Sequence, residues 1–559
     1  MDKILYWLSG GVPGGFGIWF AVVAALCFIW WFLHRYSPVV NHSGLARKMM
    51  IVLGLIVLTY TTIRFARPPK PFNVYVGILP LENQGSNKSL SVAGTGWGLA
   101  EITTHHAALG SPEHLHFLRP EWLVESYFGD STSAISPSNK QKLFRWARLI
   151  KLNYLVAGFY NADANPVSMS YEVYDVLTGE TMRSFTNTIP TGDEVPYGQA
   201  MRTAAEELMT YLYEVTDEEF NSAADHTDLF QTKSLPLYFS ARDLLAHEQW
   251  DSAFAVARMA LQKDSASVLG WFAAGSAYTE KMIREKDARA REMLQRRGEY
   301  HLKRGAQIND QYQPILMSLA RNFSFTKPEP RYLDAEFAMI ASQAIYKRDY
   351  QLYYILSFMQ RMRWETFEMK SREEILNRAI EINPASFDAY VALGQDFLER
   401  SRPHDHLSQY ALNNFNVALQ LKPNDFESIM GMVRACDYLA YFDKAVELLE
   451  RAEKFYPDRA DVYYTYGVIY YHKGEYIREK TKLREGHEQF PIAEGYFKKA
   501  VQLNNSPYAW LYLGKIYDYQ KRRNEAIEAL RTVMKLLKPD DRYREEARKK
   551  LREYFPDVE

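Results

Sequence analysis

The stretch Trp510-Leu-Tyr-Leu-Gly-Lys-Ile-Tyr517 decides the fold of the C-terminal half of the chain. Its pattern, W-x2-L-G-x2-Y, has the i, i+3, i+4, i+7 spacing of one helix face. Gly514 on that face would let a second helix approach closely, and Ala526 and Leu530 supply that second helix. Because a single pair of helices cannot bury its own apolar face, we expect similar pairs stacked beside it.

Neighbouring pairs are found by counting back along the chain. Pro423 and Pro457 end two successive second helices and are separated by 34 residues, which is the tetratricopeptide period. The small residues of five clear first helices are Ala241, Gly275, Gly394, Gly467 and Gly514. The pattern resembles the tetratricopeptide repeat family, and it implies an all-α solenoid over residues 232–540 with a degenerate region at 310–380. A charged insertion is expected at 478–489, and a solvated capping helix at 541–559.

Two apolar segments near the N-terminus predict a membrane anchor within residues 1–70. Residues 16–33 carry no charge over 18 positions, and residues 49–63 lie between basic residues. As helices they would extend about 27 Å and about 22 Å, against a hydrocarbon core of roughly 30 Å. No small-residue cleavage site follows the first segment, so we expect two transmembrane helices rather than a signal peptide. Basic residues are almost equally numerous on the two sides of the membrane in this arrangement, so they do not decide the orientation of the chain in the membrane.

A mixed α/β sandwich is expected after the proline-rich linker 67–71. The predicted strands are residues 74–81, 115–118, 154–160, 167–176 and 181–189, and the predicted helices are residues 94–109, a segment starting at Ser136, and 194–212. The motifs Ile78-Leu-Pro-Leu-Glu-Asn83, Tyr154-Leu-Val-Ala-Gly-Phe-Tyr160 and Tyr171-Glu-Val-Tyr-Asp175 occur in this order. Over residues 72–215 they resemble the amino-terminal domain of TolB-type translocation proteins. This resemblance implies a non-enzymatic interaction module in the periplasm, and with it an inner-membrane location.

Composition excludes some classes of function. The net charge of −1 over 559 residues gives no bulk attraction for nucleic acid, so we expect no nucleic-acid partner. The two cysteines, Cys27 and Cys436, cannot form a disulfide framework.

A cluster of histidines and a series of glycines could indicate a metal site or a dinucleotide site. His105, His106, His114 and His116 could suggest a metal site, but adjacent residues point about 100° apart on a helix and no His-x3-His pair occurs. A histidine-rich helix end is therefore the preferred interpretation, and metal binding stays open. The glycines at 94, 96 and 98 lack dinucleotide spacing. The sequence contains no known catalytic motif, so we predict no enzymatic activity and no cofactor.

The concave side of the solenoid is the predicted binding surface. Tyrosine combines a large contact area with a polar tip, as interfaces favour. The candidate partner-binding residues are Arg434, Tyr438, Tyr464, Tyr471, His472, Tyr508, Lys515 and Tyr519. Packing between helices is the alternative role for the tyrosines. The Lys/Asn clamp that some tetratricopeptide proteins use for a C-terminal carboxylate is absent.

The predicted fold class is therefore mainly α: two transmembrane helices, a small mixed α/β sandwich and an all-α solenoid. The predicted function is a non-enzymatic, membrane-anchored scaffold of a cell-envelope assembly. It would bind proteins or peptides in the groove, and other membrane subunits through the spans. The alternative is a transmembrane sensor or regulatory subunit whose soluble domains bind a ligand or partner.

Overall fold

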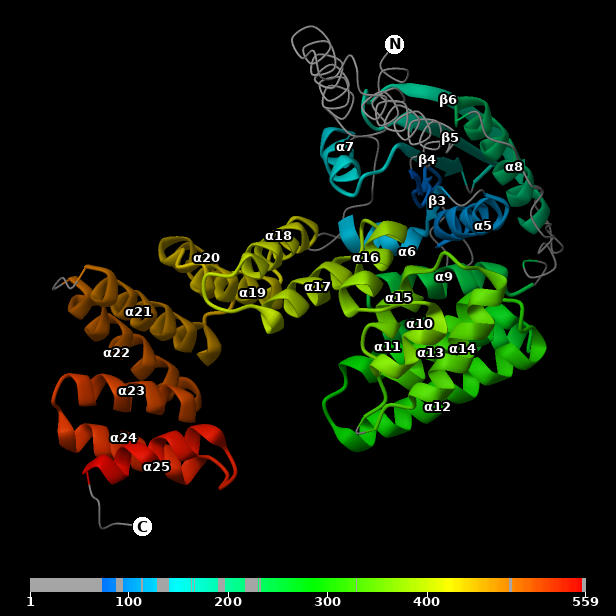
Figure 1. Ribbon diagram of the computed structural model, residues 1–559. Helices are drawn as coiled ribbons and strands as arrows, with labels where there is room; N and C mark the ends of the chain where they lie inside the picture. The colour runs from blue at the N-terminus through cyan, green and yellow to red at the C-terminus, as the bar shows by residue number, and fades with distance from the viewer. Residues whose placement is uncertain are drawn as a thin grey trace, which may run out of the picture. The chain divides into compact units, whose positions relative to one another are not determined.

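Figure 1 shows a computed structural model of the chain. The structure describes residues 73–86, 94–111, 114–127, 140–161, 163–164, 166–189, 197–216, 230, 233–327, 329–481 and 485–554.

The predicted fold class is wrong in its membrane part. Within the described ranges, no helix is both long and apolar enough to cross a membrane. The two segments predicted to do so, residues 16–33 and 49–63, lie outside those ranges. We therefore correct the fold class to a mainly helical protein with a tetratricopeptide-like solenoid. The inner-membrane and periplasmic location predicted with the spans is withdrawn as well.

A mixed sheet lies near the start of the described chain. Its strands are β1 (Val74–Ile78), β2 (Glu82–Asn83), β3 (Leu115–Leu118), β4 (Tyr154–Asn161), β5 (Val167–Asp175) and β6 (Thr181–Ile189). The strand order is β3-β1-β4-β5-β6, and β2 pairs with β4. β1 is parallel to both β3 and β4, whereas β5 is antiparallel to β4 and β6. The parallel strands are joined by helical crossovers, as such pairs require.

The helices beside the sheet are α5 (Thr95–Gly110), α6 (Pro120–Tyr127), α7 (Lys140–Leu149) and α8 (Tyr197–Thr216). β3 and β6 have the bounds predicted from the sequence, and α5 differs by one residue at each end. α6 and β2 were not predicted. α8 is tied to the sheet by the buried hydroxyl of Tyr171, which donates to the carbonyl oxygen of Ala204 over 3.0 Å.

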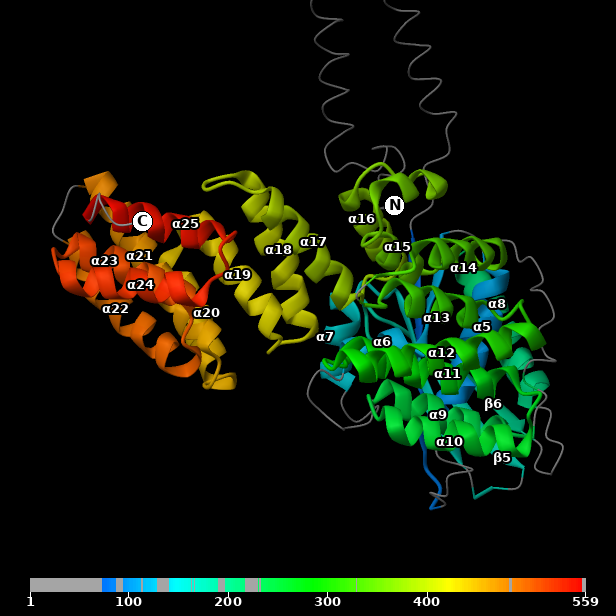
Figure 2. The same ribbon diagram turned by 90° about the horizontal axis from the view of Figure 1, so that it is seen from below.

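A helical array makes up the rest of the described chain. Its helices are α9 (Leu235–Ala246), α10 (Trp250–Lys263), α11 (Val268–Arg284), α12 (Ala288–Ile308), α13 (Gln313–Ser324), α14 (Tyr332–Ile345), α15 (Tyr350–Leu356), η3 (Arg361–Arg363), η4 (Glu365–Phe367), α16 (Arg372–Ile382), α17 (Phe387–Arg400), α18 (His406–Leu421), α19 (Phe426–Tyr438), α20 (Phe442–Phe455), α21 (Ala460–Thr481), α22 (Glu485–Asn504), α23 (Pro507–Tyr519), α24 (Arg523–Leu536) and α25 (Arg542–Tyr554). Most consecutive helices pack against each other along the array (Figures 1 and 2), and α13 contacts both α14 and α15.

Glycines set the distance between helices in the array. The ring of Phe415 in α18 lies between Gly394 of α17 and Gly431 of α19. A Cβ atom added to these glycines would lie 2.9 Å and 2.5 Å from that ring, closer than van der Waals contact allows. At Gly514 the added atom would lie 3.0 Å from Leu530. The small residues expected from the repeat pattern are therefore the points of close approach between helices.

The described residues of the charged segment expected as an insertion at residues 478–489 belong to the end of α21 and the start of α22. α21 and α22 have 22 and 20 residues and pack along their length. Gly474 and Gly486 permit this packing far from the repeat motif, because a Cβ at Gly474 would lie 2.9 Å from the carbonyl oxygen of Gly486. The degenerate region after residue 310 contains α13 to α16, with the short turns η3 and η4 between α15 and α16.

The sheet and the first helices of the array share one continuous core. Gly98 of α5 lies against the ring of Phe239 in α9, where a Cβ would come within 2.0 Å of it. Arg348, between α14 and α15, donates to the carbonyl oxygens of Ser111 and Leu115 over 2.8 Å and 2.9 Å. The sheet thus packs directly against the array.

We expect Gly431→Ala to lower the apparent melting temperature of the full chain. Its methyl group would press on Phe415, and overpacking of this kind costs about 1 to 3 kcal/mol. Gly495→Ala is the matched control, because this helical glycine is exposed and an added Cβ meets no atom within 4 Å. The control should be neutral or stabilising by about 0.5 to 1 kcal/mol. Equal melting temperatures for the two variants would contradict this account of the packing.

Candidate functional site

Aromatic side chains gather around Tyr512 of α23. Its ring lies 5.0 Å from that of Phe497, stacked, and 5.2 Å and 6.1 Å from those of Tyr471 and Tyr464. His472 lies at the edge of this group, 6.5 Å from Tyr512. We call these five residues the tyrosine cluster. The structure therefore brings together three predicted partner-binding residues, Tyr464, Tyr471 and His472.

The central residue of the cluster was missed by sequence reasoning. Tyr512 lies between Leu511 and Leu513 in the repeat motif, and the sequence pattern assigned no role to this position. Burial raises the pKa of both Tyr464 and Tyr471 to about 12. Their hydroxyl groups therefore stay protonated near neutral pH, and the cluster offers ring faces and neutral hydroxyls rather than an acid or a base.

Three other predicted residues contact neighbouring side chains of the C-terminal repeats. Tyr508 is 39% exposed and its ring lies 5.2 Å from that of Tyr543 in α25. Lys515 Nζ pairs with Glu546 Oε1 of α25 over 2.8 Å and lies 4.9 Å above the ring of Tyr512. Tyr519 packs against Phe490 and His487 of α22. The C-terminal helix α25 thus contacts predicted binding residues directly.

The remaining two predicted residues lie on α19. Arg434 is exposed and Tyr438 is half-buried. On the described part of the chain, no ring contact joins Tyr438 to Tyr512. Asp437, beside Tyr438, pairs with His472 of α21 over 2.8 Å. This hydrogen bond links α19 to the edge of the tyrosine cluster.

A second group of charged and aromatic side chains lies where the sheet meets the array. Arg119, before α6, donates to Gln313 Oε1 over 2.6 Å and pairs with Asp349 Oδ2 over 3.2 Å. Trp122 of α6 packs edge-on to Tyr350, with ring centroids 4.7 Å apart. The segment 119–122 therefore contacts two helices of the array, α13 and α15.

The same segment meets the groove side of the first repeat. Glu121 Oε1 pairs with Arg242 Nη2 over 3.3 Å. Arg242 follows the small residue Ala241, as Lys515 follows Gly514 in the last repeat, so both belong to the predicted concave side. The chain's own segment 119–122 thus contacts the side of the first repeats that is predicted to be concave.

Acidic and basic groups alternate in a charged network around this segment. Glu101 of α5 accepts from the hydroxyl of Tyr238 over 2.6 Å and from Arg242 Nε over 3.2 Å. The network contains three carboxylates (Glu101, Glu121 and Asp349) and two guanidinium groups (Arg119 and Arg242). Burial raises the pKa of Glu121 above its usual range, and the negative charge of Glu101 adds to the effect, whereas Arg242 and Arg119 oppose it.

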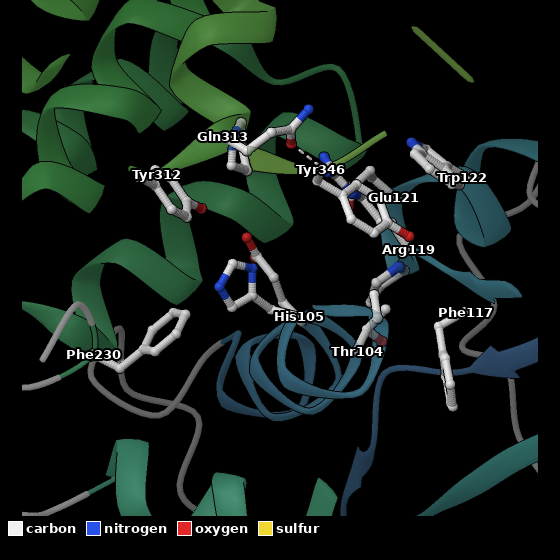
Figure 3. Close-up of a pocket in the computed structure, with 14 residues that line it drawn as sticks. Thr104, His105, Phe117, Arg119, Glu121, Trp122, Phe230, Tyr312, Gln313 and Tyr346 are labelled. Atoms are coloured by element: carbon white, nitrogen blue, oxygen red, sulfur yellow. Dashed lines mark hydrogen bonds between the residues drawn. The ribbon is translucent and has the colours of Figure 1, made fainter. Parts of the chain in front are cut away.

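Two hollows border the charged network. A cavity of about 40 Å³ lies between α5, α6 and the start of α13, as Figure 3 shows, with Thr104, His105, Glu121, Tyr312 and Tyr346 around it. A pocket of about 220 Å³ shares Arg119, Glu121 and Trp122 with the cavity, and Arg242, Ser276 and Glu280 also line it. Ser276 follows Gly275, so this pocket is the continuation of the groove along the first repeats.

The histidines at 105, 106, 114 and 116 do not form a metal centre in the structure. His116 is buried and stacks on Tyr75, and burial lowers its pKa to about 4. His105 instead lines the cavity. Among the described residues, no group of three or more His, Cys, Asp or Glu side chains is arranged to hold a metal ion.

Comparisons with known proteins agree with the repeat architecture. No family model matches the chain. Photosystem I assembly protein Ycf3 of Acaryochloris marina (strain MBIC 11017) is 27% identical over 104 residues, which make up 18% of this chain and 61% of that protein. With the 34-residue period, this match supports a tetratricopeptide-like helical repeat protein. The TolB-type resemblance predicted for residues 72–215 is not shown by these comparisons.

Solved structures are similar only in part. The human IFIT1 dimer with m7Gppp-AAAA has a TM-score of 0.34 and 14% identity, over 60% of this chain and 78% of that chain. A tetratricopeptide repeat protein from Parabacteroides merdae ATCC 43184 has a TM-score of 0.33 and 12% identity, over 48% of this chain and 98% of that chain. Similarity at this level carries no information about ligands.

We expect Asp349→Ala to destabilise the full chain strongly. Asp349 is fully buried, pairs with Arg119, accepts from Gln313 Nε2 over 2.9 Å and caps α15 through the backbone N–H of Gln351. Removing one partner of a buried ion pair costs about 3 to 5 kcal/mol. Thermal unfolding should therefore show a large decrease in melting temperature.

The control for this variant is Asp425→Ala. Asp425 caps α19 through the backbone N–H of Ser428 over 2.7 Å and is half-buried. Loss of such a cap costs about 1 kcal/mol. If Asp349→Ala and Asp425→Ala lower the melting temperature equally, the ion pair with Arg119 contributes little to stability.

Proposed function

We propose that this chain is a non-enzymatic scaffold that holds protein or peptide partners in the groove of its helical repeats. The tetratricopeptide-like architecture supports this proposal, because such repeats form extended concave binding surfaces. The name of the partial relative, an assembly protein, is compatible with a role in bringing proteins together. The lack of a known catalytic motif in the sequence also favours a binding role.

The tyrosine cluster carries the proposal. The groove of the first repeats already contains the segment 119–122, which leaves the repeats from α17 onward as the better partner site. Arg434 and Tyr508 expose side chains there, and Tyr464 and Tyr471 add aromatic surface with polar tips. Tyr and Arg are the residue types that contribute most to protein interfaces. The proposed site is thus the set predicted from the sequence, centred on Tyr512.

The division of the chain into functional parts is also a proposal. We retain 72–215 as an α/β module, 232–540 as the repeat solenoid and 541–559 as the cap. The module would position the first repeats, and the solenoid would bind the partner. The transmembrane sensor alternative required the two spans to carry a signal across a membrane, and it is set aside with them.

The proposal is tested by reversing one groove charge. Arg434→Glu changes an exposed residue and should leave the fold unchanged, which circular dichroism and thermal unfolding can check. Partners captured by the wild-type chain from the source cells should bind this variant at least about tenfold more weakly in a direct binding assay.

The matched control is Arg258→Glu on α10, a second helix of a repeat, where the arginine is also exposed. It makes the same change of charge away from the groove. We expect the control to bind partners as the wild-type chain does. Partner binding that survives Arg434→Glu, or is weakened equally by both variants, would rule out the groove around α19 as the site.

A further inference from the structure

Among the described residues that line the cavity between α5, α6 and α13, three buried side-chain atoms of Thr104, Glu121 and Trp122 lack hydrogen-bond partners. Two are oxygens that can accept, Oε2 of Glu121 and the hydroxyl oxygen of Thr104, and the third is the donor Nε1 of Trp122. Thr104 is only 2% exposed, and both residues line the cavity (Figure 3). Buried polar atoms are nearly always hydrogen-bonded in folded proteins. The pair of unsatisfied oxygens therefore indicates a missing hydrogen-bond donor.

The charges around the cavity are also unbalanced. Arg119 forms an ion pair with Asp349, and Arg242 forms ion pairs with both Glu101 and Glu121. The charges that act most on Glu121 are those of Arg242, Glu101 and Arg119. Three carboxylates against two guanidinium groups leave one excess negative charge in this network. An incompletely compensated charge in a buried site is costly, and a small cation at Glu121 would remove the imbalance.

The walls of the cavity suit an organic cation. The rings of Phe117, Phe230, Tyr312 and Tyr346 line it. Aromatic faces attract cations, most strongly when the site is shielded from water. The volume of about 40 Å³ exceeds the roughly 10 to 15 Å³ needed for one water molecule. The cavity can therefore hold a group of a few heavy atoms.

We propose that this cavity binds a primary ammonium group. Its N–H groups would donate to Oε2 of Glu121 and to the hydroxyl oxygen of Thr104, and its alkyl carbon would lie among the aromatic rings. An ammonium group has three donors and no acceptor, which matches two oxygens that lack donors. This site is separate from the tyrosine cluster, so it does not depend on the proposed partner groove. A free small amine or a lysine side chain could supply the group.

The direct test is isothermal titration of the full chain at constant ionic strength. Methylammonium chloride is the main ligand, and sodium chloride and tetramethylammonium chloride are the controls. Methylammonium should bind at one site with measurable heat. Sodium ions lack N–H donors and tetramethylammonium is both larger and without them, so neither should compete. No methylammonium binding, or equal binding of either control ion, would overturn the proposal.

Variants locate the site within the chain. Glu121→Gln removes the acceptor charge, and Thr104→Val removes the hydroxyl with almost no change in volume. Each should weaken methylammonium binding about tenfold or more, as expected for loss of a hydrogen bond to a charged group. Thr104→Val leaves every ion pair of the network intact, so it tests the site even if Glu121→Gln perturbs folding.

The control for loss of a carboxylate is Glu427→Gln on α19, an exposed position, which should bind methylammonium as the wild-type chain does. Unchanged binding in both Thr104→Val and Glu121→Gln would place the ligand elsewhere and overturn the assignment. A parallel titration with Nα-acetyl-lysine methylamide, whose side-chain ammonium group is free, distinguishes a lysine side chain from a free small amine. Binding of this compound would assign the cavity to a lysine side chain, and binding of methylammonium alone would assign it to a free amine.

Discussion

The ion pair between Arg119 and Asp349 is the interaction on which the arrangement of the sheet and the array depends. Asp349 is fully buried, and its carboxylate both caps α15 and accepts from Gln313. A buried carboxylate with this many partners is stable only while each stays in place. Arg119 therefore fixes the segment 119–122 in the groove, and the cavity beside Glu121 exists because that segment is held there.

The spacing of helices in the array is regular where glycine or alanine lies at the contacts between them. The longer helices α21 and α22 make their close contact in a different way. Phe415 fills the space left by Gly394 and Gly431, which sets the distance between α17, α18 and α19. In α21 and α22 the extra turns of helix lie outside the repeat pattern and make their own close contact through Gly474 and Gly486. Longer helices at this point extend the surface next to the tyrosine cluster, since Phe490 of α22 packs against both Tyr471 and Tyr519.

The local parts of the fold could be predicted, and the long-range contacts could not. The bounds of β3 and β6 and the positions of Gly394 and Gly514 follow from periodicity and residue size, which act over short distances. The contact of Arg119 with Asp349 joins residues far apart in the sequence, and no local pattern records it. Tyr512 was missed because its contacts with Tyr464, Tyr471 and Phe497 join different helices, and no local pattern records them. The prediction of two membrane spans relied on apolar length, flanking basic residues and the lack of a cleavage site, and it was wrong for the fold class.

The two ends of the array are closed in a similar way. At the first repeats, α6 brings an ion pair, Arg119 with Asp349, next to an aromatic contact, Trp122 with Tyr350. At the last repeat, α25 brings Glu546 to Lys515 and Tyr543 to Tyr508. Both helices contact predicted groove positions near an end of the array. The predicted residues Arg434, Tyr438, Tyr464 and Tyr471 lie on α19 and α21, between these two ends. The proposed site around Tyr512 is therefore bordered by α25, beside which Tyr508 is still 39% exposed.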